Sequence, residues 1–224
     1  MVWIAPALLS ANFARLGEAL EIAKSAGATM VHIDVTDGHF TPDVSVGQPV
    51  LARLRQATDL VLDVRLAIER PERFADDFLK AGADRVSIHV ESTRHWHSTL
   101  ESVRARRAKA GVALNPETPV DLIEDALGDL DFLTILSADL GADGRFIPWA
   151  AAKVRQAARL REDRRLGFAI QVEGGIGLES VEELIRSGAD ILVAGSAIFH
   201  SENPKARLQE MIRLASEVRQ TSRA

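Results

Sequence analysis

His32 and Asp34 are the first residues in the chain whose types and spacing could do chemistry. They end an apolar run, and residues two apart on a strand point to the same side. A histidine beside a carboxylate can share a metal ion or a proton. The pair could equally form a polar layer inside the fold, satisfied by hydrogen bonds. From these two residues alone, both interpretations stay open.

Glycines follow two apolar runs nearer the C-terminus. Gly174 and Gly175 come directly after Glu173, and Gly195 is followed by Ser196. The backbone N–H groups of such glycines can bind a phosphate, particularly where a short helix begins. The alternative is that the glycines only permit tight turns. We favour phosphate binding, because both pairs lie at the ends of neighbouring predicted strands.

Arg65 is a charged residue within the mostly apolar run 62–66. A buried charge needs a partner or a ligand, and Asp34 on the preceding predicted strand is the expected partner. The two could also form a purely structural ion pair.

The five lysines lie away from the predicted ends of strands. They are Lys24, Lys80, Lys109, Lys153 and Lys205, all on predicted helices or at helix ends. A Schiff-base aldolase needs a buried amine in its pocket. That class of enzyme is therefore not expected.

These residues must be positioned by an alternation of short apolar runs and longer amphipathic ones. The predicted strands are residues 2–8, 30–34, 60–66, 85–89, 111–114, 132–136, 168–172 and 191–194. The predicted helices are residues 13–26, 50–56, 72–80, 98–109, 119–127, 148–161, 178–186 and 205–218. Eight units in 224 residues give 28 residues per unit. The pattern predicts one α/β domain over residues 1–224, a single (β/α)8 TIM barrel.

A faint repeat supports the barrel. Gly-Ala pairs at 27–28, 82–83 and 188–189 each close a predicted helix just before a strand. Glycine suits the left-handed residue that ends a helix. The alternative, an open doubly wound sheet, lacks a Gly-x-Gly-x-x-Gly turn after the first strand. In a barrel, active groups are expected at the carboxyl ends of the strands.

Composition excludes several classes of function. The net charge is −5, which disfavours a nucleic-acid surface or a polybasic membrane anchor. There is no cysteine and no tyrosine, so thiol nucleophiles, disulfides, Cys-ligated zinc and phenolic acids or bases are excluded. The first residues lack the basic flank and apolar run typical of a signal peptide, and no run of ~18 apolar residues occurs, so neither a signal peptide nor a membrane span is expected. We expect a cytoplasmic protein that contacts neither membrane nor nucleic acid.

The order of motifs resembles the ribulose-phosphate 3-epimerase family nearly from end to end. The matching segments are residues 4–11, 32–40, 42–47, 81–84, 89–91, 111–119, 146–148, 174–176 and 194–199. The resemblance implies a TIM-barrel enzyme of pentose phosphate metabolism. It would move a proton next to the carbonyl of a ketose phosphate, through an enediolate. It also implies a homo-oligomer, either a dimer or a hexamer.

The resemblance assigns roles residue by residue. Family members use one Asp on strand two and one on strand seven as acid and base, and Asp34 and Glu173 stand at these places. The same pair, with two histidines, holds a divalent metal, and His32 matches one histidine whereas Arg65 replaces the other. The residues implied to bind the substrate and its phosphate are Ser10, His32, Gly144, Gly174, Gly175, Gly195 and Ser196.

Departures from the family pattern suggest altered chemistry. Three methionines around the family's substrate are Thr36, Ala67 and Leu136 here. Arginine cannot deprotonate to become a metal ligand. We therefore favour no cofactor, although a divalent metal (Zn, Fe, Mn or Mg) on His32, Asp34 and Glu173 stays open.

Three functions follow from these expectations. The first is a sugar-phosphate epimerase or isomerase without a metal, acting on a substrate other than, or in addition to, ribulose 5-phosphate. Its acid–base pair would be Asp34 and Glu173, with Arg65 stabilising the enediolate. The second is a metal-dependent ribulose 5-phosphate 3-epimerase. The third is an inactive barrel that binds a sugar phosphate.

Overall fold

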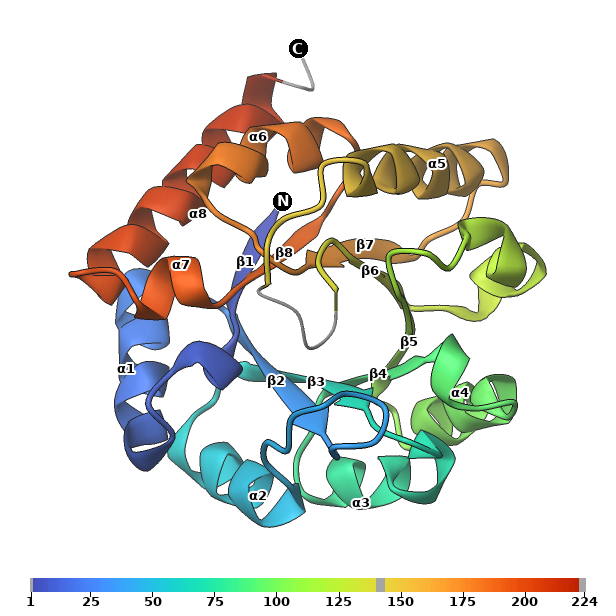
Figure 1. Cartoon of the computed structure of the whole chain (residues 1–224), viewed down its shortest axis with the longest axis horizontal. Coiled ribbons are helices and arrows are strands. Elements are labelled where there is room, and N and C mark those ends of the chain that lie inside the picture. The colour runs from blue at the N-terminus through green and yellow to red at the C-terminus, as the bar shows by residue number, and fades with distance from the viewer. Residues whose placement is uncertain (1, 140–143, 222–224) are drawn as a thin grey trace.

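Parallel strands form a ring surrounded by helices in the computed structural model, which describes residues 2–139 and 144–221 (Figure 1). Within those residues there are eight strands, in the order β1-β8-β7-β6-β5-β4-β3-β2. They are β1 (Trp3–Pro6), β2 (Met30–Thr36), β3 (Val61–Ala67), β4 (Arg85–His89), β5 (Lys109–Leu114), β6 (Phe132–Leu136), β7 (Ala169–Glu173) and β8 (Ile191–Ala194). The predicted (β/α)8 TIM barrel is confirmed.

The helices cover the outside of the ring (Figure 1). They are α1 (Leu16–Ala26), α2 (Gln48–Ala57), α3 (Ala75–Lys80), α4 (Trp96–Ala105), α5 (Ala150–Asp163), α6 (Leu178–Arg186), α7 (Ser196–Phe199) and α8 (Pro204–Thr221). Short 3-10 turns lie at Leu8–Ser10, Phe13–Arg15, Pro71–Arg73 and Val90–Ser92. Gly27, Gly82 and Gly188 all have positive φ, which agrees with their predicted place at helix ends.

Two predicted helices differ from the structure. The segment Val120–Asp129 forms 3-10 turns. Its buried residues Val120, Ile123 and Leu127 are spaced by three and then four, so apolar spacing alone does not distinguish the two helix types. Helix α4 ends at Ala105, and Arg107 takes a left-handed conformation with φ of 62°. Lys109 therefore begins strand β5 and does not lie on a helix as predicted.

Apolar side chains fill the layer between strands and helices, and a group of polar side chains surrounds Asp63 inside the barrel. Asp63 accepts hydrogen bonds from Arg85 Nε (2.9 Å) and Gln171 Nε2 (3.0 Å). The Arg85 guanidinium lies 4.0 Å from the centre of the Phe132 ring. Gly111 makes room for that ring, since a Cβ at Gly111 would lie 2.6 Å from it.

Strand register positions the candidate site. Parallel pairing of β2 with β3 places Asp34 beside Arg65. Pairing of β6 with β7 places Leu136 beside Glu173. Among the described residues, an isolated bridge between Ala7 and His32 closes the ring between β1 and β2. None of the helices in the described ranges is both long and apolar enough to cross a membrane.

Candidate active site

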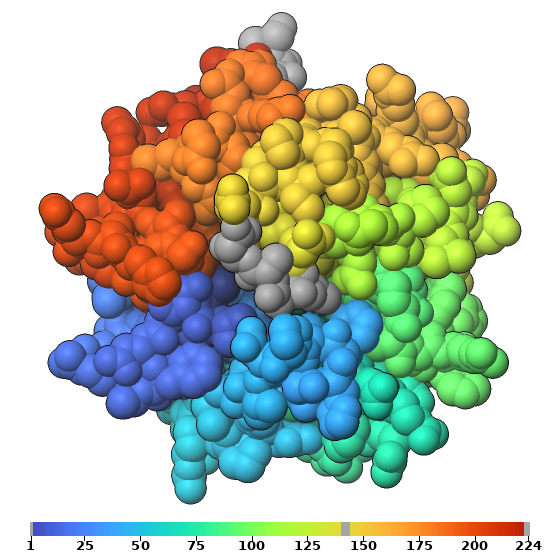
Figure 2. Space-filling model, viewed as in Figure 1, coloured from blue at the N-terminus to red at the C-terminus, as the bar shows by residue number. Residues whose placement is uncertain are grey.

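A pocket of about 240 Å³ opens at the carboxyl ends of the strands. Asp34, Arg65 and Glu173 line it together. Most of the residues expected to bind phosphate line it too: Ser10, Gly144, Gly174, Gly175, Gly195 and Ser196. In the space-filling view of this face, the segment leading into α5 (yellow) and residues following β2 (blue) lie around the barrel axis (Figure 2). The barrel therefore gathers at one mouth residues that are far apart in sequence.

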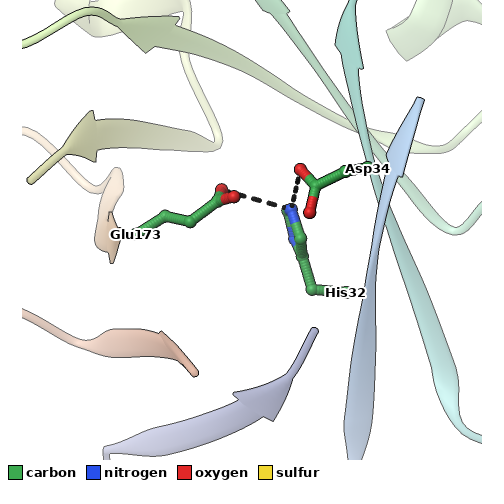
Figure 3. Close-up of side chains that lie close together, drawn as sticks. All are labelled: His32, Asp34 and Glu173. Carbon is green, nitrogen blue, oxygen red and sulfur yellow. Dashed lines mark hydrogen bonds and ion pairs between the residues drawn. The ribbon is translucent and has the colours of Figure 1, made fainter. Parts of the chain in front are cut away.

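Asp34 and Glu173 approach each other from β2 and β7, with His32 between them (Figure 3). His32 Nε2 lies 3.1 Å from Asp34 Oδ1 and 3.2 Å from Glu173 Oε2. Oε2 of Glu173 is buried and makes no hydrogen bond within the described part of the chain. His32 itself is fully buried beneath the two carboxylates and is absent from the pocket lining.

Arg65 bridges the two carboxylates. Its Nε donates to Asp34 Oδ1 at 2.8 Å. Its Nη2 lies 2.7 Å from Asp34 Oδ1 and 2.9 Å from Glu173 Oε1. The expected Arg65–Asp34 partnership is present, and Glu173 is a second partner. One cation thus contacts both candidate acid–base groups.

Burial and charge shift the pKa values of this cluster in opposite directions. Burial raises the pKa of Asp34, but Arg65 and His32 outweigh burial and hold that pKa well below its usual range. Burial lowers the pKa of His32, but Glu173 and Asp34 outweigh it, so the pKa of His32 lies well above its usual value. Asp34 is therefore ionised and His32 is charged at neutral pH.

Asp63 holds the other side of the His32 ring. Its Oδ2 lies 2.7 Å from His32 Nδ1. Burial raises the pKa of Asp63, but Arg85 and His32 outweigh it and bring that pKa to about 2. An ionised Asp63 fixes the ring so that Nε2 points toward Asp34 and Glu173.

His32, Asp34 and Glu173 form a group that could hold a metal ion, since one ligand atom from each lies within 4.8 Å of the others. In the structure, however, the Arg65 guanidinium bonds both carboxylates. Two unit charges ~4 Å apart repel by roughly 4 kcal/mol at an effective dielectric of 20, and a divalent ion would feel about twice that repulsion. A divalent metal on these atoms would have to displace Arg65 from the two carboxylates.

The glycine-rich loops pack closely against their neighbours. A Cβ on Gly174 would lie 2.6 Å from the backbone nitrogen of Ala138, and one on Gly175 2.6 Å from the carbonyl oxygen of Gly144. A Cβ on Gly195 would lie 3.2 Å from Ser10 Cβ. Ser196 begins helix α7. The structure thus brings the expected phosphate-binding residues together, and at Gly174 and Gly175 the backbone contacts leave no room for a Cβ.

Several residues around the site were not anticipated from the sequence. Ser137 Oγ donates to the carbonyls of Glu173 (3.0 Å) and Gly174 (2.7 Å), fixing the end of β7. Asp43 lines the pocket too. Its place there depends on the conformation of a loop, for which the sequence carries no periodic signal.

Lys153 is buried on α5, yet it does not line the pocket. Its Nζ donates to the carbonyl of Asn115 at 2.7 Å. Burial lowers the pKa of Lys153 to about 8. No lysine is among the described residues that line the pocket, although Lys109 begins strand β5 and does not lie away from a strand end as predicted.

Barrel and site together define the class: an enzyme of the (β/α)8 type that holds opposed carboxylates, bridged by a cation, beside glycine-rich loops. A family model described as "Ribulose-phosphate 3 epimerase family" matches residues 3–199. The chain belongs to the ribulose-phosphate 3-epimerase family. By that membership it is an isomerase acting on carbohydrate phosphates.

Curated relatives match most of the chain. A ribulose-phosphate 3-epimerase of Bacillus subtilis (strain 168) is 39% identical over 213 residues, covering 94% of this chain and 98% of the relative. One from Synechocystis is 40% identical over 203 residues, covering 89% and 88%. The chloroplastic enzyme of Arabidopsis thaliana is 41% identical over 203 residues, covering 89% and 72%.

Solved structures with lower identity share the fold. A 3-hexulose-6-phosphate synthase has a TM-score of 0.66 at 22% identity, covering 95% of this chain and 98% of the other. A protein titled KGPDC from Streptococcus mutans has a TM-score of 0.71 at 16% identity, covering 97% and 99%. At these identities the likeness concerns the barrel alone.

The relatives bear on the substrate that the sequence suggested. They give no support to a substrate other than ribulose 5-phosphate. They favour the substrate of the second hypothesis, the metal-dependent ribulose 5-phosphate 3-epimerase, over that of the first. Thr36 and Ala67, which suggested a different substrate, do not line the pocket, whereas Leu136 does.

Proposed function

We propose that the chain epimerises ribulose 5-phosphate at C3. The observation that carries this proposal is the pair Asp34 and Glu173, facing each other from β2 and β7 with Arg65 bonded to both. Epimerisation needs a base on one face of the reacting carbon and an acid on the other. Two opposed carboxylates meet that requirement.

In the proposed reaction, one carboxylate removes the proton from C3, and the C–H electron pair moves toward the neighbouring carbonyl. The carbonyl oxygen takes up negative charge and an enediolate forms. The other carboxylate, in its acid form, then delivers a proton to the opposite face of C3. The product is the C3 epimer, and no other bond is broken.

Arg65 is proposed to stabilise the negative charge of the enediolate. Its guanidinium is permanently protonated and is only 4% exposed. A fixed cation in a site shielded from water stabilises developing charge more than one in bulk water does. We favour no cofactor for this reason, and a metal-dependent reaction would require Arg65 to leave its present position.

The phosphate of the substrate is proposed to bind between the β7 and β8 loops. Gly174, Gly175, Gly195 and Ser196 lie there, with Ser10 beside Gly195. Gly144 faces Gly175 across the mouth. This placement follows the usual position of phosphate sites in TIM barrels. His32 lies too deep to contact the phosphate and supports the carboxylates instead.

We also propose a cytoplasmic homo-oligomer, either a dimer or a hexamer. Leu9 and Phe13 are large apolar side chains that are 42% and 44% exposed, and they line the same small pocket. Exposed apolar side chains that lie together favour contact with another protein surface. Light scattering at several concentrations measures the assembly, and a strictly monomeric protein contradicts it.

The function is tested by incubating the protein with ribulose 5-phosphate in heavy water and following C3 by NMR. The parent chain is expected to introduce deuterium at C3 and form the epimer. Asp34→Asn and Glu173→Gln are each expected to lower turnover by about 10²- to 10⁴-fold, the usual contribution of a general acid or base.

Asp59→Asn is the matched control, because Asp59 pairs with Lys24 on the surface, far from the mouth in the fold. It should turn over like the parent. Full activity of either Asp34→Asn or Glu173→Gln would contradict the assigned roles. Thermal stabilisation by the sugar phosphate without any deuterium incorporation would instead indicate the inactive sugar-phosphate-binding barrel.

A further inference from the structure

Arg65 has a third partner that is neither acid nor base in the proposed reaction. Its Nη1 lies 3.0 Å from Nε2 of His89, the last residue of β4. Register explains this contact, because Arg65 pairs with Ser87 and His89 lies two residues further along the same strand. His89 is completely buried, so water does not compete for this bond.

The contact fixes the proton arrangement of the imidazole. A guanidinium has only donors, so Nε2 of His89 must accept and the ring proton must reside on Nδ1. Nδ1 lies 3.3 Å from Glu91 Oε2 and donates to it. Burial, partly opposed by this bond to Glu91, lowers the pKa of His89 to about 4. His89 is thus neutral at physiological pH, as an acceptor must be.

Glu91 is itself anchored. Its Oε1 accepts the backbone N–H of Asn115 at 2.7 Å, and the carbonyl of Asn115 accepts from buried Lys153. Burial raises the pKa of Glu91, but hydrogen bonds from His89 and Thr118 outweigh burial and keep that pKa below its usual value. The loop after β5 therefore holds Glu91, which holds His89.

The charges of the three partners of Arg65 behave differently during the reaction. Asp34 and Glu173 each gain or lose a proton in the proposed cycle, and a protonated carboxyl holds a guanidinium less strongly than a carboxylate does. His89 stays neutral throughout. The hydrogen bond from Arg65 to His89 therefore keeps its strength while the carboxylates transfer protons.

We propose that His89 and Glu91 are positioning residues that keep the Arg65 guanidinium aimed at the reacting oxygens while the two carboxylates change charge. This inference rests on the proposed function. Phe40 adds to the support, with its ring centre 4.8 Å from that of His89. A series of contacts from Asp34 through Arg65 and His89 to Glu91 thus links the reacting centre to the loop after β5.

The test compares His89→Leu with His89→Gln, using kcat and KM for ribulose 5-phosphate. His89→Leu removes the acceptor, and kcat is expected to fall ~100-fold, the cost of a misplaced catalytic group, with KM changed far less. His89→Gln restores an acceptor oxygen and should recover most of kcat. Ser87→Ala is the matched control, because Ser87 is buried on the same face of β4 and its hydroxyl makes no hydrogen bond among the described residues.

A second readout does not depend on activity. Nitrogen-15 NMR of arginine side chains should resolve slowly rotating Nη protons for Arg65 in the parent, identified by their loss in Arg65→Lys. In His89→Leu the guanidinium should rotate faster, so the separate Nη signals should merge into one. In His89→Gln the separate signals should remain. An Arg65 signal unchanged in His89→Leu, or kcat of His89→Leu within twofold of the parent, would overturn the inference.

Equal damage in His89→Gln and His89→Leu would also overturn it, because the acceptor would then be irrelevant. If the parent chain turns over no ribulose 5-phosphate, the proposed function fails. The NMR comparison then still decides whether His89 holds Arg65.

Discussion

At the scale of the residue, Arg65 lies at the centre of the site, in contact with two of the three residues that could bind a metal. His32, Asp34 and Glu173 supply three ligand atoms, yet Arg65 bonds two of these residues. Each carboxylate is held by a cation of the chain itself. In the proposed reaction, the positive charge that stabilises the enediolate would therefore come from the chain itself and not from a metal ion.

Chelation and Arg65 substitution test this arrangement. Protein freed of metal by chelator should keep its full activity, because Arg65 supplies the charge. Arg65→Met keeps much of the side-chain length but removes the charge, and should lower kcat by about 10²- to 10³-fold, as removal of one oxyanion donor does. Elemental analysis establishes the metal content of the treated protein, and steady-state kinetics measure its activity and the kcat of Arg65→Met.

The control for that experiment is Arg53→Met, which removes an exposed arginine that bonds only Gln56 in its own helix among the contacts described here. It should leave kcat unaltered. Stoichiometric metal in the active parent, with loss of activity on chelation, would contradict the role given to Arg65.

Sequence reasoning selected the residues that are proposed to react, but it did not predict the contacts that support them. A charge in an apolar run demanded a partner, and this argument predicted the Arg65–Asp34 pair. The bond from Arg65 to His89 joins two strands and depends on register, for which the residues around position 89 carry no local sign. Supporting contacts of this kind require the folded barrel.

At the scale of the element, the loop after β7 demands glycine for two reasons. Gly175 has φ of 64°, and a Cβ there would collide with the backbone of Gly144 and Phe146. The β7 loop and the segment before α5 are therefore in backbone contact. This contact shapes one wall of the pocket.

Gly175→Ala should push these two segments apart and strain the backbone by about 1–3 kcal/mol. We expect KM for ribulose 5-phosphate to rise about tenfold, equivalent to about 1.4 kcal/mol of binding, with a smaller change in kcat. Steady-state kinetics and thermal unfolding measure both effects.

Gly17→Ala is the comparison, since Gly17 lies on α1 with no neighbour within 4 Å of an added Cβ. It should preserve KM and stabilise the helix slightly. An unchanged KM in Gly175→Ala would argue against phosphate binding at this loop.

Strand positions followed well from the sequence, because buried parallel strands form apolar runs with clear ends. The type of helix followed less well. Residues Val120–Asp129 bury Val120, Ile123 and Leu127 as expected, but they do so in 3-10 turns. The spacing of apolar residues predicts which face is buried, but it does not predict whether the backbone hydrogen bonds are those of an α-helix or of a 3-10 helix.

At the scale of the whole molecule, the proposed phosphate site should couple ligand binding to stability. A ligand that binds only the folded state at 100 times its Kd adds about 2.7 kcal/mol. For a chain of this size, that corresponds to a rise in Tm of roughly 5–10 °C. Inorganic phosphate is the probe, measured by calorimetry.

Potassium chloride at matched ionic strength is the control and should produce no comparable rise. Gly175→Ala should need more phosphate to reach the same Tm. Identical Tm values with phosphate and chloride at all concentrations would speak against an anion site at the mouth.

The seam between β1 and β2 has a mechanical consequence. The bridge that closes the ring there uses the backbone of His32, the residue whose side chain supports both carboxylates. A cellular unfoldase that pulled on the N-terminal strand would separate β1 from β8 and break the Ala7–His32 bridge before the other strands separated. The site would then be disrupted while most of the barrel remained folded. A partly unfolded molecule would therefore be inactive before it could be degraded.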